Sequence, residues 1–158
     1  MKKLFVLSML LVFSQLAFGQ SAALDKFMGH YKGKDGVMKM SFNGSFDFGS
    51  DDNLKKFNFK SAKSKIKGVR LFILDEKANV QNADFQTLVS DMKRAHFEDL
   101  MTIRKGGDRV YFMGRETDKG YTDITFLTKG SKGGAFLMSL EGFFSKQDVE
   151  NMTKASND

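Results

Sequence analysis

The sequence predicts an α+β fold with a single, mostly antiparallel sheet, a C-terminal four-strand meander, and helices packed on one face. Two observations support this prediction. From residue 100 onward, apolar residues recur with a period of two in four consecutive runs separated by hairpin-length gaps, which is typical of an antiparallel meander. Apolar residues with helical spacing lie in separate segments before and after the meander, which indicates helices that pack against the sheet.

Residues 1–19 have the three parts of a secretory signal peptide. Two lysines begin the segment, residues 4–13 form an apolar run, and the small residues Ala17 and Gly19 precede Gln20. The apolar run is shorter than the roughly twenty residues that a membrane-spanning helix needs. We therefore expect cleavage after residue 19 and export to the periplasm or the medium of a Gram-negative cell, with no transmembrane anchor after signal removal.

The mature chain, residues 20–158, has the length of a single α+β domain, and no linker or repeat divides it. Loss of the two signal-peptide lysines leaves 23 basic and 19 acidic side chains, a net charge of +4. This charge is low for a nucleic-acid binder, and export would keep the protein away from nucleic acid. The absence of Cys excludes disulfides, thiol nucleophiles and thiolate metal sites, so a packed core must stabilise the fold.

The first part of the mature chain predicts one helix and two strands. Residues 22–31 place apolar side chains at helical spacing, residues 37–42 alternate as a strand does, and residues 69–74 form a compact apolar run typical of a buried strand. The side chains expected to share a face are Leu24, Phe27, Met28 and Tyr31 in the helix, and Met38, Met40 and Phe42 in the first strand. Residues 43–67 contain turn signals and short alternating Phe pairs but no long element.

Residues 83–97 have the clearest helical pattern, and Asn82 or Asp84 can accept hydrogen bonds from the first N–H groups of the helix. Its apolar face carries Phe85, Leu88, Val89, Met92 and His96. The meander then alternates at Met101 and Ile103, at Val110 and Phe112, at Thr122, Ile124, Phe126 and Thr128, and at Phe136, Met138 and Leu140. Residues 145–148 have the pattern of a capping box opening a last helix, with Val149 and Met152 facing inward.

Three Gly-rich breaks that carry lysines separate the strands of the meander, at residues 105–108, 118–120 and 129–134. Glycines beside lysines can cradle a phosphate, but neither G-x-x-x-x-G-K-[ST] nor a strand-to-helix G-x-G-x-x-G occurs. A phosphate loop also leads into a helix N-terminus, whereas these breaks lead into predicted strands. We interpret them as hairpin turns whose lysines lie in solvent.

The same order of segments resembles domain of unknown function 4252, a family of small exported bacterial proteins. The stretches that carry the resemblance are LDKFMGHYKGKDGVMKMSF, KIKGVRLFILDE, FQTLVSDMKRAHFEDLMTIRKGGDRVYFMGRE and FLMSLEGFFSKQDVENM. They cover most of residues 22–152, while the Phe-rich and Gly-rich residues 43–60 depart from the more helical sequence of other members. The shared motifs are structural, and the family has no assigned activity, so the resemblance implies no activity for this chain.

Residues that usually carry catalysis or bind metals form no matching pattern. His30 and His96 are the only histidines, HExxH is absent, and the oxygen ligands within residues 47–53 lack EF-hand spacing. The acidic pairs lie at element ends, where carboxylates are solvated: Asp75 with Glu76, Glu98 with Asp99, and Glu116 with Asp118. A G-x-S-x-G nucleophile turn is also absent. We therefore expect no cofactor, no metal site and no enzymatic activity.

One patterned polar feature remains, the lysines of KSAKSKIKGVR. In an extended chain Lys63, Lys65 and Lys67 would project from one face. One interpretation is an anion-binding edge for lipid phosphate or an acidic polysaccharide. The other is an edge strand that lysines protect from sheet-to-sheet aggregation, and the two are compatible.

The expected function is that of a non-enzymatic interaction module whose partner is an envelope protein or an anionic surface polymer. The alternative is a small-molecule or lipid carrier with a Phe-rich pocket, and a hydrolase of unrecognised geometry is a third hypothesis. An exposed apolar patch over a filled core would favour partner binding. A large Phe-lined cavity would favour the carrier, and convergent acids or a His in a cleft would favour the hydrolase.

Export predicts a processed N-terminus at Gln20, or within about three residues of it, because signal peptidase cuts after small residues. Intact mass spectrometry of the protein from an expressing Gram-negative cell checks this directly, allowing for cyclisation of an N-terminal Gln. Recovery of the full-length chain in the membrane fraction would contradict export.

Overall fold

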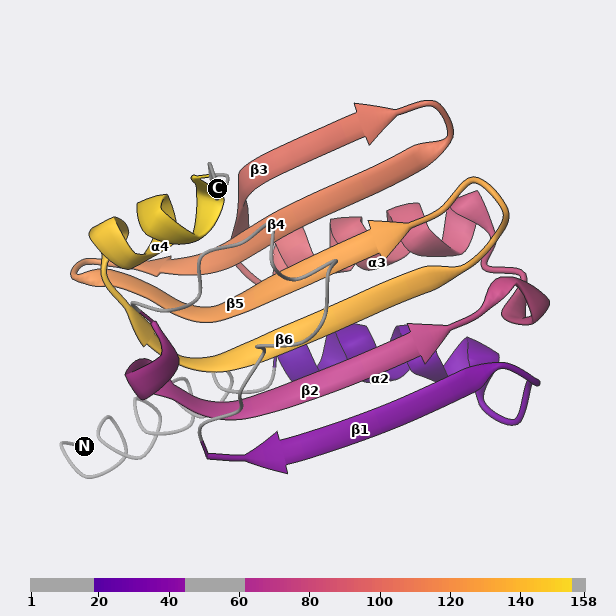
Figure 1. The fold of residues 1–158 in the computed structure, drawn as a ribbon, viewed down its shortest axis with the longest axis horizontal. Coiled ribbons are helices and arrows are strands. Elements are labelled where there is room, and N and C mark those ends of the chain that lie inside the picture. Colours follow the sequence, from indigo (N-terminus) through magenta and orange to yellow (C-terminus); the bar gives the residue numbers. More distant parts are fainter. Residues whose placement is uncertain (1–18, 45–61, 155–158) are drawn as a thin grey trace, which may run out of the picture.

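The computed structural model describes residues 19–44 and 62–154, and within them it has the predicted α+β fold (Figure 1). Residues 1–18 of the predicted signal peptide and the oxygen ligands within residues 47–53 lie outside the described residues. The helices are α2 (Gly19–Tyr31), α3 (Asn82–Arg94) and α4 (Lys146–Thr153). The strands are β1 (Val37–Asn43), β2 (Ile66–Leu74), β3 (Phe97–Lys105), β4 (Asp108–Thr117), β5 (Gly120–Lys129) and β6 (Ala135–Phe144). None of these helices is long and apolar enough to cross a membrane.

The six strands form one sheet in the order β1-β2-β6-β5-β4-β3, and every neighbouring pair is antiparallel. The last four strands of the chain form the predicted meander, because each pairs with the next in sequence. β2 pairs with β6 and β1 pairs with β2, so β1 and β3 are the edge strands of the sheet.

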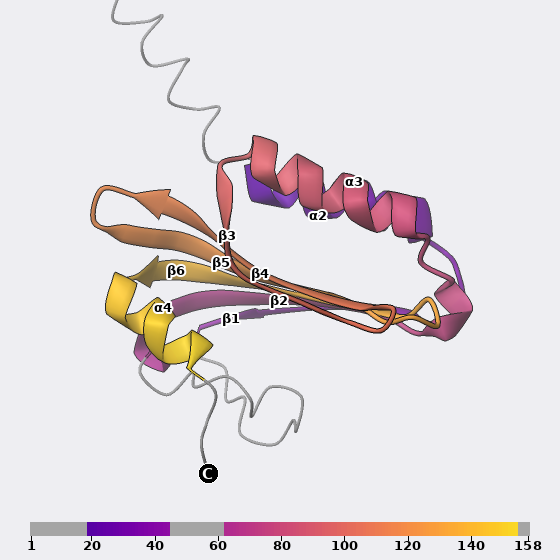
Figure 2. The same ribbon diagram turned by 90° about the horizontal axis from the view of Figure 1, so that it is seen from above.

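α2 and α3 lie side by side on one face of the sheet, which we call the helix face (Figure 2). The predicted stripe of α2 is confirmed, because all four of its members are buried. The buried strand residues in this core are Phe72, Leu74, Phe97, Tyr111, Met113, Leu127, Ala135 and Leu137. Two hydrogen bonds tie the helices together: Lys26 donates to Asp91 at 2.7 Å, and the Tyr31 hydroxyl donates to Asp84 at 2.6 Å.

α4 lies on the opposite face of the sheet, which we call the α4 face (Figure 2). Val149 and Met152 are buried there, as predicted for the last helix. The strand residues in this second core include Val69, Leu71, Phe112, Ile124, Phe126, Met138, Leu140 and Phe144. The expectation that the helices share one face therefore holds for α2 and α3 but not for α4, because the apolar positions of β6 that lead into α4 point to the other side.

α3 ends earlier than the helical pattern predicts. Its last residue is Arg94, and His96 adopts a left-handed conformation with φ 64° as the chain turns into β3. His96 is therefore exposed rather than part of the apolar face. The N-cap is Gln81, whose side chain makes no capping hydrogen bond, and Asp84 instead accepts from Tyr31.

A β-bulge changes the predicted face of one residue in β5. Ile124, Phe126 and Thr128 lie on the α4 face, since their partners include Leu140, Met138 and Phe136. In the pairing with β4, Gly114 lies opposite Ile124 and Arg115 lies opposite Thr122, so Asp123 is the extra residue of β5, and it has φ 55°. Because the extra residue reverses the alternation, Thr122 does not share a face with Ile124 as the sequence pattern indicates.

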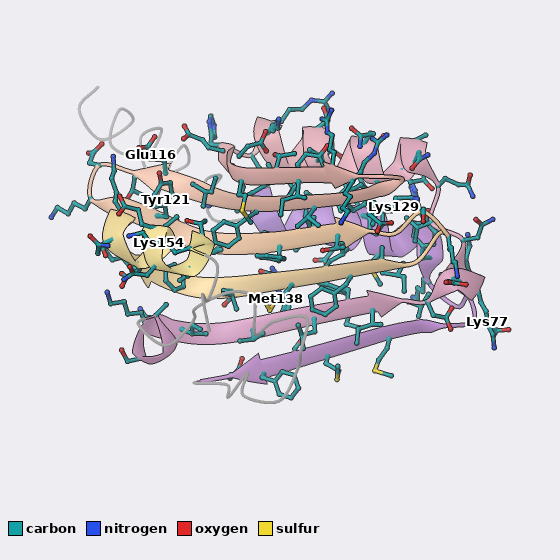
Figure 3. The ribbon with its side chains drawn as sticks, turned by 45° about the horizontal axis from the view of Figure 1, so that its top comes forward. Lys77, Glu116, Tyr121, Lys129, Met138 and Lys154 are labelled. Carbon is teal, nitrogen blue, oxygen red and sulfur yellow. The ribbon has the colours of Figure 1, made fainter. Side chains whose placement is uncertain are left out.

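The three Gly-rich breaks are hairpin turns, as predicted. Gly106 and Gly133 have φ 60° and 93°, backbone values that residues with a side chain rarely adopt, and glycine adopts them without steric cost. One lysine differs from the prediction: Lys129, at the end of β5 in Figure 3, is only 4% exposed, and its ammonium group donates to the Gly130 carbonyl at 3.1 Å. It pairs with Ala135 and so lies on the sheet rather than at the turn tip.

Two glycines in contrasting surroundings provide a test of the fold. A Cβ on Gly142 in β6 would lie 2.4 Å from the backbone oxygen of Lys65, whereas a Cβ on Gly29 in α2 would meet nothing within 4 Å. We expect Gly142→Ala to lower the free energy of unfolding by about 1–3 kcal/mol through overpacking. Gly29→Ala should raise it by roughly 0.5–1 kcal/mol through helix propensity. Urea denaturation measures both, and equal effects would contradict this packing of residues 63–65 against β6.

Candidate functional site

The three candidate lysines do not share one strand face. Residues 63–65 form the 3₁₀ helix η1 (Lys63–Lys65), and the strand begins only at Ile66, so Lys67 alone is extended. The edge-protection interpretation is wrong, because β2 lies between β1 and β6 and is not an edge strand. Lys65 and Lys67 are exposed, and anion binding by the lysines of this segment stays a prediction.

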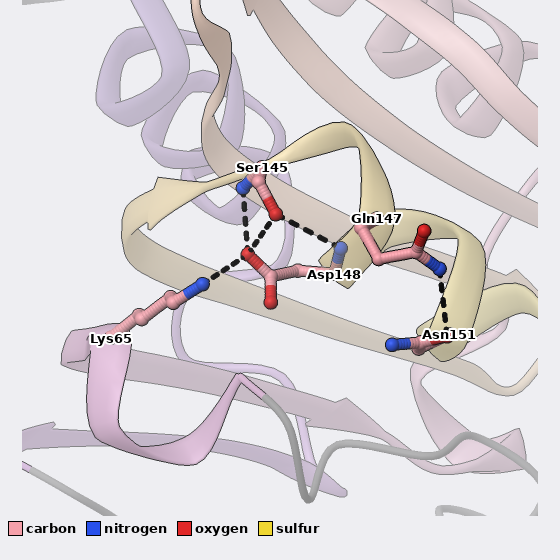
Figure 4. Close-up of polar contacts among 5 residues, drawn as sticks. All are labelled: Lys65, Ser145, Gln147, Asp148 and Asn151. Atoms are coloured by element: carbon pink, nitrogen blue, oxygen red, sulfur yellow. Dashed lines mark hydrogen bonds and ion pairs between the residues drawn. The ribbon is translucent and has the colours of Figure 1, made fainter.

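Lys65 has a structural partner in the capping box of α4 (Figure 4). Its ammonium group donates to the Asp148 carboxylate, which also accepts from the backbone and hydroxyl of Ser145 at 2.7 and 2.6 Å. The Ser145 hydroxyl accepts in turn from the Asp148 N–H, which completes the predicted box. Burial alone would raise the pKa of Asp148, but the bonds from Lys65 and Ser145 outweigh it and hold this pKa below its usual range.

A cleft of about 640 Å³ opens where α3 ends and the β4–β5 hairpin approaches the start of α4. Its lining includes His96, Glu98, Glu116 and Asp118, so it brings together a histidine and acids that the sequence analysis considered separately. All four side chains are exposed, and Lys146 contacts Glu116 at 3.4 Å. Since solvent surrounds these acids alike, nothing in the cleft sets one apart as proton donor and another as base.

The β5–β6 turn borders a hollow of about 410 Å³ lined by residues of the third Gly-rich break. The N–H groups that a phosphate would need have acceptors within the fold. Ser131 N–H donates to Asp108 at 2.8 Å, and Gly130 N–H donates to the Gly134 carbonyl at 2.9 Å. The turn is therefore a closed hairpin and not a phosphate cradle.

A row of mostly apolar residues, with Thr128 on β5 as the polar member, crosses all six strands at the end of the α4 face farther from α4. Met38 pairs with Ile73, Ile73 with Phe136, Phe136 with Thr128, Thr128 with Val110, and Val110 with Ile103. We call these six residues the apolar band. Met38 is 54% exposed and Ile103 45% exposed, and the four between them are partly buried. The next row toward α4 contains buried residues such as Met138 (Figure 3), so the band is the accessible margin of a filled core.

A charged cluster on the helix face escaped the sequence analysis. It consists of Arg70 on β2, Glu141 on β6, Asp123 on β5 and Arg115 on β4. Arg70 Nε lies 3.7 Å from Glu141 Oε1, and Arg115 Nη1 lies 3.8 Å from Asp123 Oδ2. One feature of the sequence indicates the cluster, because Arg70 is a charged residue within the otherwise apolar segment VRLFIL. Its neighbours could not be predicted, because they lie on strands that are distant in the sequence.

Asp123 is electrostatically unlike the other acids. Burial raises its pKa above the usual range, while Arg115 lowers it less strongly, Glu141 raises it further and Arg70 lowers it. The two arginines therefore do not fully compensate the loss of solvent around this carboxylate. Within the described ranges, no group of three or more His, Asp or Glu side chains is placed to hold a metal ion.

Fold and surface together define a small α+β protein with one six-stranded antiparallel sheet covered unequally on its two faces. The chain belongs to the family described as Domain of unknown function (DUF4252), whose model matches residues 31–152. This confirms the resemblance found in the sequence. No curated protein and no solved structure matches the chain.

Removing the negative charge of Asp148 or of Asp123 should have different effects on the stability of the fold. Asp148→Asn should lower the free energy of unfolding at pH 7 by about 1 kcal/mol, as for loss of a helix cap. Asp123→Asn should leave it unchanged or raise it, because the charged form of Asp123 is disfavoured in the fold and Asn also tolerates positive φ.

The difference in stability between each variant and the unmodified protein should shrink as the pH falls, for opposite reasons. Asp148 stabilises the fold above its unfolded pKa, near 4, and loses that contribution as it is protonated. Asp123 gains stability as the pH falls through its raised pKa. Chemical denaturation of both variants between pH 3 and 7 tests these expectations. If Asp123→Asn lowers the free energy of unfolding at pH 7 as much as Asp148→Asn does, the expectation for Asp123 is wrong.

Proposed function

We propose that the protein is an exported, non-enzymatic interaction module of the Gram-negative envelope that binds a partner protein through the apolar band. The observation that carries this proposal is the exposure of large apolar side chains at both ends of the band, at Met38 and Ile103. A continuous row of exposed and partly buried apolar side chains beside a filled core is costly in water and is typical of a binding surface.

The shape of the band favours a protein over a small apolar molecule. Six strands at about 4.8 Å spacing make it about 24 Å long, and it runs out to both edge strands. A lipid or small molecule is usually enclosed by its carrier, whereas a surface open at both ends suits an extended partner. The hollow beside the β5–β6 turn includes Thr128 and Phe136 of the band, and it offers a partner side chain an anchoring pocket.

Of the three functional hypotheses, the hydrolase receives the least support from the geometry. The cleft at His96 carries exposed, solvated acids, and the charged cluster at Asp123 includes two arginines beside its carboxylates. A lipid carrier remains the alternative function, because lipid tails would cover the same apolar band.

Photo-crosslinking in the envelope tests the proposal. A benzoylphenylalanine in place of Met38 should give one discrete protein adduct on irradiation of intact cells. Ile103→Asp, at the other end of the band, should remove the adduct because it places a charge in the interface. Ser90→Asp, the same charge change at an exposed position of α3, should leave it intact.

Analysis of the purified adduct and of the total lipid extract distinguishes binding of a partner protein from carriage of a lipid. A protein adduct that persists in Ile103→Asp would contradict docking on the band. A lipid adduct at Met38 without any protein adduct would replace the proposed function with the carrier.

A further inference from the structure

The two edges of the sheet are protected unequally. β3, at one edge, carries four charged residues among its nine, and its pairing with β4 shifts register between Asp99 and Met101. Charged side chains and β-bulges keep an exposed edge strand from pairing with another chain. β1, at the other edge, has one charged residue among seven and an uninterrupted register with β2. Of the two edges in the described sheet, β1 is therefore the one suited to accept a further strand (Figure 1).

The one lysine of β1 does not protect this edge. Lys39 lies opposite Phe72 of β2, and its ammonium group is 5.4 Å from the centre of the Phe72 ring. The same group lies 3.7 Å from Asp25 of α2. The contact with Phe72 draws the side chain inward over the helix face. A lysine that blocks pairing extends past the edge into solvent, and Lys39 is held over the sheet instead.

The backbone of β1 presents a regular set of hydrogen-bonding groups at the edge. The Gly44 N–H donates to the Lys67 carbonyl at 2.8 Å, and the Gly36 carbonyl accepts from Asp75 at 2.8 Å, so both pairs continue the β1–β2 register. Such directly bonded pairs alternate along an antiparallel ladder, so the even-numbered residues of β1 bond to β2. The odd-numbered residues point their N–H and C=O groups away from the sheet, and these are Val37, Lys39, Ser41 and Asn43.

This outward set is complementary to itself. When two β1 strands run antiparallel about a two-fold axis at Met40, Val37 of each copy lies opposite Asn43 of the other. Lys39 likewise lies opposite Ser41. The four residue pairs make two hydrogen bonds each, eight in all, within the range of a specific interface. A two-fold axis at Lys39 would instead place two lysines opposite each other and leave Asn43 outside the paired region.

We propose that the protein forms a two-fold dimer in which the β1 strands of two copies pair with Met40 at the centre. The two six-stranded sheets then form one sheet of twelve strands. The charged strand β3 lies at both outer edges, so assembly stops at two copies instead of continuing into a fibre. On the α4 face, Met40 meets its counterpart, and Met38, which is 54% exposed, lies beside Phe42 of the second copy.

The dimer goes beyond the proposed function and does not depend on it. A two-fold axis perpendicular to the sheet keeps both α4 faces on the same side, so the dimer presents two apolar bands to one partner surface. A repetitive partner would then bind with avidity. The tests below use the purified protein without a partner, so a failure of the dimer is separate from a failure of crosslinking to a partner protein.

A single cysteine at the two-fold axis tests the register, because the chain has no cysteine of its own. In the processed protein from exporting cells, Met40→Cys should form an intermolecular disulfide on mild oxidation, since opposite residues bring their Cβ atoms to about 4.5–5.5 Å. Lys39→Cys should crosslink several-fold less, because the two introduced thiols would lie on a diagonal of about 7–8 Å. Thr102→Cys, at an exposed position of β3, should stay monomeric.

Sedimentation equilibrium gives a second measurement that needs no cysteine. The unmodified processed protein should reach twice the monomer mass as its concentration rises. Ser41→Lys places a lysine opposite Lys39 at two points of the interface and should weaken the dimer about tenfold, because like charges directly opposite repel. Thr102→Lys, the same charge change on β3, should alter dimer affinity by less than about twofold.

The outcomes that would overturn the proposal are distinct. A purified protein that is monomeric at every concentration would leave β1 open to a strand of a different protein. Equal disulfide formation by Met40→Cys and Thr102→Cys would indicate random collision. A dimer that Ser41→Lys and Thr102→Lys weaken equally would lie on another surface. If Met40→Cys fails to fold, sedimentation of the unmodified protein and of Ser41→Lys still decides between these results.

Discussion

The sheet carries apolar side chains on both faces of its central strands, and both faces must be removed from water for the sheet to be stable. α2 and α3 cover one face through Phe27, Leu88 and their neighbours, while α4 reaches only one end of the other. The chain has no cysteine and therefore no disulfide to hold the sheet, so the placement of the three described helices decides which side chains of the described strands remain accessible. The apolar band and the charged cluster are the two places where this coverage ends.

The apolar band and the charged cluster lie on opposite faces and at opposite ends of the sheet. The band lies on the α4 face at the end where β5 turns into β6, and the charged cluster lies on the helix face at the end where β6 runs into α4. A partner on one surface therefore leaves the other open.

Local patterns predicted the elements well because local physics forms them. The alternation of Phe136, Met138 and Leu140 and the capping box at Ser145 depend on neighbours in sequence, and both are present in the fold. The errors arose where tertiary structure overrides local pattern. His96 leaves the helix because the chain must turn into β3, and Thr122 changes face because β5 bulges at Asp123.

The charged cluster lay beyond sequence reasoning for a related reason. Arg70 and Glu141 meet only because β2 pairs with β6, a pairing that joins distant parts of the chain and that no local spacing encodes. The exposed acids at Glu98 and Glu116 could be placed at element ends, yet the cleft that unites them depends on how α3, β4 and α4 converge.

The strand order also constrains when the chain can fold. β3 to β6 pair with sequence neighbours, so their hairpins can form within microseconds of becoming free. β2 has no partner but β1 until β6 arrives from the far end of the chain, and such non-local pairing is slow. A chain that emerges from its N-terminus therefore cannot complete this sheet until β6, its last strand, is available to pair with β2.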